Sequence, residues 1–143
     1  MKVVPDSNII VAQVLTLPYT SAAIAKMQQW QEQKAEFLVP VLWSYEVVST
    51  IRKAVVISGL SADRAKAAVQ YILSMGIREV SPTPALHQRA LEWATQLNQT
   101  VAYDATYLAL AESVEAEFWT ADRRLADAAR NAGASWVHYI DEA

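Results

Sequence analysis

The sequence has no cysteine, and only 3 glycines, 5 prolines and 2 histidines among its 143 residues. Without cysteine there is no disulfide framework, no thiolate metal site and no cysteine nucleophile. The shortage of glycine and proline excludes collagen-like and linker-rich chains. The chain must therefore fold around an apolar core, and the lack of cysteine fits a reducing compartment, which we expect to be the cytoplasm.

Long hydrophobic runs and an excess of positive charge are also absent. The apolar stretch 37–45 is far shorter than the roughly 20 residues that a membrane-spanning helix needs. The start of the chain lacks the apolar segment of a signal peptide. The formal net charge is −3, which excludes a generally basic nucleic-acid coat but leaves room for local basic patches.

The composition is that of a folded globular domain. Hydrophobic residues make up 53% of the chain and charged residues 19%, which excludes a disordered chain. A length of 143 residues matches one domain, so residues 1–143 are expected to form a single unit.

Short apolar runs alternate along the chain with longer helical stretches. The expected strands are 2–4, 36–39, 78–80, 117–119 and 135–137. The expected helices are 7–14, 20–34, 41–58, 61–75, 83–97, 104–114 and 121–131. This alternation predicts an α/β fold, a three-layer α/β/α sandwich with a mostly parallel sheet of about five short strands.

Four carboxylates fall where such a fold places its ligand crevice, beyond the carboxyl ends of the strands. Asp6 follows the first strand directly, and Asp122 follows the fourth. Asp104 begins a helix, and Glu46 lies one turn into the helix that follows the second strand. We expect all four to converge on one crevice.

Each aspartate also has a purely structural interpretation, because Asp is a favoured residue at helix N-termini. Glu46 is harder to explain in this way. It stands among apolar residues, and no cation lies four residues before or after it. A carboxylate in such surroundings is costly unless something neutralises it, and a divalent cation would do so.

The donor set favours a hard cation. Three or four carboxylates completed by water suit Mg²⁺ or Mn²⁺. Zinc fits poorly, because the only histidines are His87 and His138, with no ligand spacing between them.

Four segments together carry a family resemblance. They read VPDSN at 4–8, LWSYEV at 42–47, YDATYLALA at 103–111 and WTADRRL at 119–125, and their acids are spaced by 40, 58 and 18 residues. In this order they resemble the signatures of the PIN-domain nucleases, and more narrowly those of the VapC ribonuclease toxins of toxin–antitoxin pairs. The resemblance covers essentially the whole chain.

The resemblance implies a metal-dependent endoribonuclease acting as a toxin. Its catalytic and metal-binding residues would be Asp6, Glu46, Asp104 and Asp122, holding Mg or Mn. Asn8 and Thr120 match positions that support the acids. RNA would be the substrate, a cognate antitoxin protein and a second copy of the chain would be the partners, and no membrane would be involved. Pro5 departs from the family pattern, and its missing backbone donor could shorten the first strand but should not move the Asp6 carboxylate.

Cations and aromatic residues suggest where RNA and protein partners bind. Arg123 and Arg124 follow Asp122 and are predicted to contact substrate phosphates, although an ion pair with Asp127 is an alternative. The side chains that could stack on bases, or belong to the core instead, are Trp43, Trp119, Tyr103 and Tyr107. Trp30 and Trp93 stand in polar helical stretches, so an exposed partner face competes with inward packing.

Two other functions remain open on sequence grounds. One is a non-catalytic PIN-like module that binds RNA or protein. The other is a phosphatase-like hydrolase with Asp6 as nucleophile, which would normally have a second aspartate two residues later. Position 8 is asparagine instead.

Overall fold

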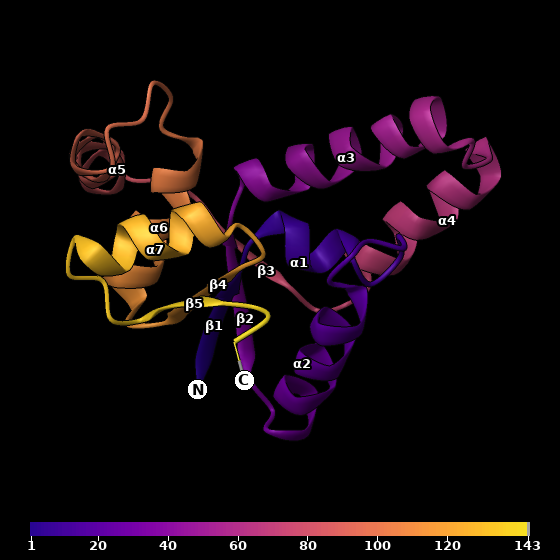
Figure 1. The fold of residues 1–143 in the computed structure, drawn as a ribbon, viewed down its shortest axis with the longest axis horizontal. Helices are drawn as coiled ribbons and strands as arrows, with labels where there is room; N and C mark the ends of the chain where they lie inside the picture. Colours follow the sequence, from indigo (N-terminus) through magenta and orange to yellow (C-terminus); the bar gives the residue numbers. More distant parts are fainter. Residues whose placement is uncertain (143) are drawn as a thin grey trace.

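The computed structural model describes residues 1–142 and has the expected α/β architecture (Figure 1). The strands are β1 (Lys2–Pro5), β2 (Glu36–Pro40), β3 (Arg78–Val80), β4 (Glu117–Thr120) and β5 (Val137–Tyr139). The helices are α1 (Ser7–Val11), α2 (Thr20–Glu32), α3 (Leu42–Ser58), α4 (Ala62–Leu73), α5 (Pro84–Gln96), α6 (Tyr103–Val114) and α7 (Arg123–Asn131).

The sheet is entirely parallel, with the strand order β3-β2-β1-β4-β5. Parallel strands need crossover connections, and helices supply them here. In Figure 1, α1 to α4 lie on one side of the sheet and α5, α6 and α7 on the other. The three-layer prediction is confirmed, since helices cover both faces of the sheet.

The strand order reverses at β1. The chain moves outward from β1 to β2 and β3, then returns to place β4 on the other side of β1. The carboxyl ends of β1 and β4 therefore flank the topological switch point, where open α/β sheets form their ligand crevice. Asp6 and Asp122 follow these two strands.

Local signals in the sequence fix several helix ends. Ser61 and Thr83 are N-caps whose side chains accept hydrogen bonds from the backbone amides of Arg64 and Leu86. Gly59 ends α3 with a φ of 71°, a left-handed conformation that glycine adopts without steric cost.

Several element boundaries differ from the sequence-based prediction; the first helix, for example, ends at Val11 rather than at position 14. Two strand boundaries can be explained from the pairing of the strands. The last strand begins at Val137 rather than Ser135, because Val137 is the residue that pairs with Phe118 of β4. The first strand is not shortened, since Pro5 is its last residue and lies beside Trp119. The ladder to β2 uses Lys2 and Val3, so the missing amide of Pro5 lies beyond it.

Both tryptophans considered for an exposed partner face are core residues. Trp30 of α2 is 1% exposed and packs edge-on against Phe37 and Trp119, with ring centroids 5.9 and 5.6 Å away. Trp93 of α5 is 3% exposed and meets Trp136 at 6.0 Å. The partner-face interpretation of these two residues is therefore wrong, and inward packing is the observed arrangement.

Within residues 1–142, the helices lack the combination of length and hydrophobicity that crossing a bilayer requires.

Candidate active site

Asp6 is the most buried of the four carboxylates, with 5% of its surface exposed. It follows β1, and its backbone amide donates to the carbonyl of Trp119 at 2.8 Å, which extends the β1–β4 ladder by one residue. Thr120 Oγ1 donates to Asp6 Oδ2 at 2.8 Å. Burial raises the pKa of Asp6 to about 7, opposed by the Thr120 hydrogen bond and assisted by the charges of Asp104 and Glu46.

Asn8 and Thr120 hold the end of β1 against the end of β4. Asn8 Nδ2 lies 3.3 Å from both Asp6 Oδ2 and Thr120 Oγ1, and Asn8 Oδ1 accepts from the amide of Ala121 at 3.1 Å. Thr120 Oγ1 also accepts from the amide of Asp122 at 3.0 Å. This network joins the two segments that carry Asp6 and Asp122, which agrees with the supporting role predicted for Asn8 and Thr120.

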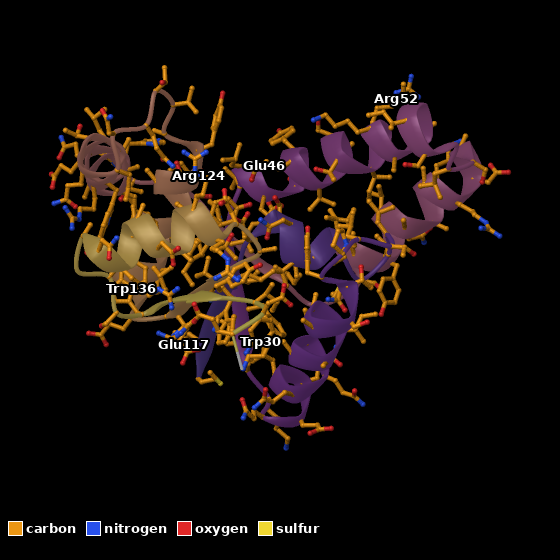
Figure 2. The ribbon with its side chains drawn as sticks, viewed as in Figure 1. Trp30, Glu46, Arg52, Glu117, Arg124 and Trp136 are labelled. Carbon is orange, nitrogen blue, oxygen red and sulfur yellow. The ribbon has the colours of Figure 1, made fainter. Side chains whose placement is uncertain are left out.

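Glu46 is half-buried near the N-terminal end of α3, as Figure 2 shows. Tyr107 of α6, which is fully buried, donates from its hydroxyl to Glu46 Oε1 at 2.6 Å. Burial raises the pKa of Glu46, the Tyr107 hydrogen bond lowers it, and the charge of Asp104 raises it. The carboxylate thus has a neutral donor and no cation as its hydrogen-bond partner among the described residues.

Asp104 lies in the first turn of α6 and is half-buried. It does not cap the helix, because α6 begins one residue earlier, at Tyr103, and Ala102 occupies the N-cap position. Gln99 Nε2 donates to Asp104 Oδ2 at 3.3 Å. Burial and the charge of Asp122 raise the pKa of Asp104, and the Gln99 hydrogen bond lowers it.

The capping interpretation fits Asp122 alone. Asp122 is exposed at the N-cap of α7, and its Oδ1 accepts from the amide of Leu125 at 3.1 Å. Asp6 occupies the N-cap position of α1, but its side chain makes no capping hydrogen bond. The burial of Asp6 and Asp104 therefore lacks the structural explanation that capping gives for Asp122.

The four carboxylates form one continuous electrostatic neighbourhood. The charges of Glu46 and Asp104 raise the pKa of Asp6, that of Asp104 raises the pKa of Glu46, and that of Asp122 raises the pKa of Asp104. The structure thus links the four side chains in pairs through their charges, although they are far apart in sequence. Their catalytic and metal-binding roles stay predictions.

The donor chemistry fits a hard divalent cation better than zinc. Within residues 1–142, no group of three or more His, Asp or Glu side chains is arranged so that it could hold a metal ion by itself. Zinc uses three or four protein ligands, whereas Mg²⁺ commonly takes one or two carboxylates together with water and substrate phosphate oxygens. His138 stacks on Trp119 at 4.7 Å, and His87 is exposed on α5.

The two arginines after Asp122 have different surroundings. The guanidinium of Arg123 lies over the ring of Tyr139 at 4.4 Å, a cation–π contact that directs it toward β5. Arg124 is exposed, and Figure 2 shows it near the start of α7. Asp127 pairs with Arg130 at 3.2 Å, so the ion pair weighed for Arg123 and Arg124 is not formed.

Most aromatic residues considered for base stacking belong to the core. Trp43, Trp119 and Tyr107 are 2%, 8% and 0% exposed. Tyr103 differs, since 58% of its surface is exposed immediately before Asp104.

Three polar side chains of this region were not predicted from the sequence. Tyr107 contacts Glu46, Gln99 contacts Asp104, and the hydroxyl of Tyr19 donates to the carbonyl of Asn8 at 3.0 Å. For Tyr107 the sequence did contain a signal, because its apolar neighbours in YDATYLALA indicate that this tyrosine is buried. A buried hydroxyl requires a hydrogen-bond partner. Nothing in the sequence pattern marked Gln99 or Tyr19.

Comparison with known proteins gives a family match. Residues 3–132 match a family model described as PIN domain. A search of curated proteins by sequence finds no match.

Solved structures with the same fold include toxin–antitoxin proteins. The chain superposes on a toxin–antitoxin complex from Klebsiella pneumoniae with a TM-score of 0.68 and 15% identity, covering 99% of both chains. The VapBC2 complex of Rickettsia felis gives a TM-score of 0.70 at 10% identity, covering 97% of this chain and 98% of that one. VapC20 of Mycobacterium tuberculosis, a toxin that cleaves the sarcin–ricin loop, gives 0.64 at 17% identity, covering 92% and 95%.

Proposed function

Because this chain belongs to the PIN domain family, we propose that it is a metal-dependent endoribonuclease and the toxin component of a toxin–antitoxin pair. One observation carries the proposal. Asp6 is buried at the switch point of the sheet, where the charges of Asp104 and Glu46 act on it, and its pKa is raised to about 7. Perturbed acids clustered at such a crevice mark a functional site more often than a structural one.

Asp6 and Asp104 are the residues that we propose to hold Mg²⁺ or Mn²⁺, with Glu46 and Asp122 beside them. When bound, such an ion polarises a phosphoryl oxygen and lowers the pKa of a bound water. The protein's own contribution is positioning. Thr120 and Asn8 fix Oδ2 of Asp6, while Ser7 donates from its hydroxyl to Oδ1 at 3.4 Å and from its backbone amide to the same carboxylate.

The choice of a phosphodiester substrate follows from charge. An anionic backbone is repelled by a bare carboxylate cluster, so the proposed ion must lie between the two. Arg124, exposed near the start of α7, is free of the aromatic contact that occupies Arg123. We assign it the primary contact with a phosphate, with Arg123 in a secondary role.

The phosphatase-like alternative is weakened by the surroundings of Asp6. Position 8 supplies an amide that donates to Asp6 and not the second carboxylate of an aspartyl-phosphate site. Asp6 Oδ2 is also engaged by Thr120. A non-catalytic binding module would bind RNA or protein without cleaving RNA, so the cleavage assay distinguishes it from the proposed nuclease.

The antitoxin partner is proposed to bind the groove between α3 and α4. This groove has a volume of about 470 Å³, and its walls are mainly apolar, including Val48, Val55, Val69 and Leu73. Figure 1 shows this helix pair extending to one side of the sheet. An apolar groove of this kind suits the apolar face of an amphipathic helix.

A homodimer is the proposed oligomeric state, to be measured by light scattering.

The experiment that tests the proposal is cleavage of single-stranded RNA with Mn²⁺ or Mg²⁺. Purified protein should cleave, EDTA should abolish cleavage, and Asp6→Asn and Asp104→Asn should lose it while keeping the circular dichroism spectrum and the thermal melt of the parent. Asp127→Asn is the matched control, because Asp127 pairs with Arg130 away from the cluster. Cleavage by Asp6→Asn at the rate of the parent would remove the proposal.

A further inference from the structure

A second cavity is built partly from α3 and α6, the helices that carry Glu46 and Asp104. It has a volume of about 210 Å³ and lies beyond Pro40 and Val80, the last residues of β2 and β3. It therefore opens at the same carboxyl edge of the sheet as Asp6. Its volume is below the roughly 300–1,000 Å³ that pockets for drug-sized molecules have, so it suits one small flat group.

Two helices that carry the acids also form walls of this cavity. Leu42 of α3 lines it, and Leu42 and Glu46 lie on one face of α3 because they are four residues apart. Tyr103, Thr106 and Leu110 of α6 line it, and Tyr103 immediately precedes Asp104. A nucleotide whose phosphate lies at the carboxylates can therefore place its neighbouring base at this cavity.

The lining is suited to a neutral aromatic ring. No acidic side chain lines the cavity, and apart from His87, Tyr103 and Thr106 its side chains are apolar. The Thr106 hydroxyl is already bound to the carbonyl of Ala102 at 2.9 Å. Tyr103 and His87 are exposed rings at its rim. Aromatic side chains of this kind take up unstacked bases of single-stranded RNA.

We propose that this cavity, which we call the base pocket, binds one unpaired nucleobase next to the phosphodiester that is cut, with Tyr103 as its stacking surface. The inference rests on the proposed ribonuclease function and adds a substrate-recognition site to it.

The test is a double-mutant cycle between Tyr103 and the base. The cut site of a single-stranded RNA is mapped first, and each nucleotide beside it is then replaced by an abasic one. In the parent protein one such replacement should lower kcat/KM by roughly tenfold, the effect expected for one stacked base. Tyr103→Ala should lower kcat/KM on the intact RNA by a similar factor and show no further loss on the abasic RNA, while Tyr103→Phe should behave like the parent.

Tyr71→Ala is the matched control, because Tyr71 on α4 is 55% exposed, close to the 58% of Tyr103, and does not line the pocket. It should leave the abasic discrimination unchanged. If Tyr103→Ala discriminates like the parent, or changes the oligomeric state, the base pocket is overturned.

The same cycle is run by fluorescence anisotropy with labelled intact and abasic RNA on the Asp6→Asn variant, so that binding is measured without cleavage. If the parent cuts no RNA, each nucleotide of the same RNA is made abasic in turn, and a Tyr103-dependent loss of binding at one of them keeps the base pocket while the nuclease proposal fails. If the parent cuts RNA but Tyr103→Ala changes the effect of the abasic replacement neither on kcat/KM nor on binding, the nuclease proposal stands and the base pocket fails.

Discussion

Asp6 carries the strongest electrostatic perturbation in the carboxylate cluster, and its position explains why. It is nearly fully buried between the ends of β1 and β4, among the negative charges of Asp104 and Glu46. Neutral donors from Thr120, Asn8 and Ser7 stabilise the carboxylate but do not cancel the effect of burial on its pKa. The ionised form of Asp6 is therefore disfavoured in the folded protein, and a carboxyl group perturbed in this way is typical of a functional site.

The stability of the metal-free protein should depend on pH through Asp6. Its pKa is about 7 when folded against 3.8 as the model-compound value, so between these values the folded state binds more protons than the unfolded state. The free energy of unfolding should then fall as pH rises from 4 to 7, by at most about 4 kcal/mol. Urea unfolding in EDTA at pH 5 and pH 8 measures it.

The matched variant is Asp6→Asn, which cannot ionise. It should be more stable than the parent at pH 8 and should lose most of the pH dependence. An Asp6→Asn protein with the same pH dependence as the parent would show that other groups are responsible.

Tyr107 is the partner of Glu46 that the sequence did not reveal. The two residues are 61 positions apart, so no helical periodicity connects them, and only the tertiary fold brings the Tyr107 hydroxyl within 2.6 Å of Glu46 Oε1. In contrast, the end-of-strand positions of Asp6 and Asp122 follow from strand order alone, which is why the sequence predicted them.

Tyr107→Phe should reduce activity without unfolding the protein. Removing the hydroxyl leaves Glu46 without its donor, and losing a hydrogen bond to a metal-site carboxylate typically costs 10- to 100-fold in activity or metal affinity. Cleavage kinetics and Mn²⁺ titration together measure the change. Tyr71→Phe on exposed α4 is the control, and equal behaviour of the two variants would show that the Tyr107 hydroxyl does not position Glu46.

At the scale of elements, the sequence predicted a helix end wherever a single capping residue or a glycine determines it. Ser61, Thr83 and Gly59 act at the positions assigned from the sequence. Asp104 was assigned as a cap because Asp favours that position, but the helix extends one residue further, to Tyr103. Propensity alone did not distinguish the cap from the first turn, where an acid also interacts favourably with the helix dipole.

Trp93 shows where a polar sequence context misleads. Its neighbours along α5 are polar, but α5 packs along α6, and Trp93 Nε1 donates to Glu112 Oε1 of α6 at 3.3 Å. Arg89 completes this contact with two hydrogen bonds to Glu112, at 2.6 and 3.0 Å. Burial of Trp93 depends on a partner helix that the local pattern does not contain.

Arg89→Ala should destabilise the α5–α6 contact by about 1 kcal/mol. The pair is bidentate and half-buried, which places it above an isolated surface ion pair. Arg78→Ala is the matched control, because Arg78 meets Glu36 at 3.4 Å on an exposed surface, and its loss should cost less than about 0.5 kcal/mol. Chemical denaturation compares the two, and equal effects would contradict a special role for the Arg89 pair.

At the scale of the whole molecule, an acidic protein is proposed to act on an anionic polymer. The net charge is −3, so overall electrostatics do not attract RNA. We propose that recognition is instead local, through a cation at the carboxylates, the exposed Arg124 and the base pocket. The alternation of strands and helices predicted the fold and the edge at which these features meet. It did not predict the groove or the pocket, because both depend on how helices from different crossovers pack.

The central claim is that the carboxylates act by binding a metal ion that competes with protons. The most direct test is the RNA cleavage rate against pH at two Mg²⁺ concentrations. Because the pKa of Asp6 is raised to about 7, the rate should rise with pH through the acid and neutral range at low Mg²⁺. A higher Mg²⁺ concentration should move that rise to lower pH. A profile that does not move with Mg²⁺, or cleavage that persists in EDTA, would contradict the account.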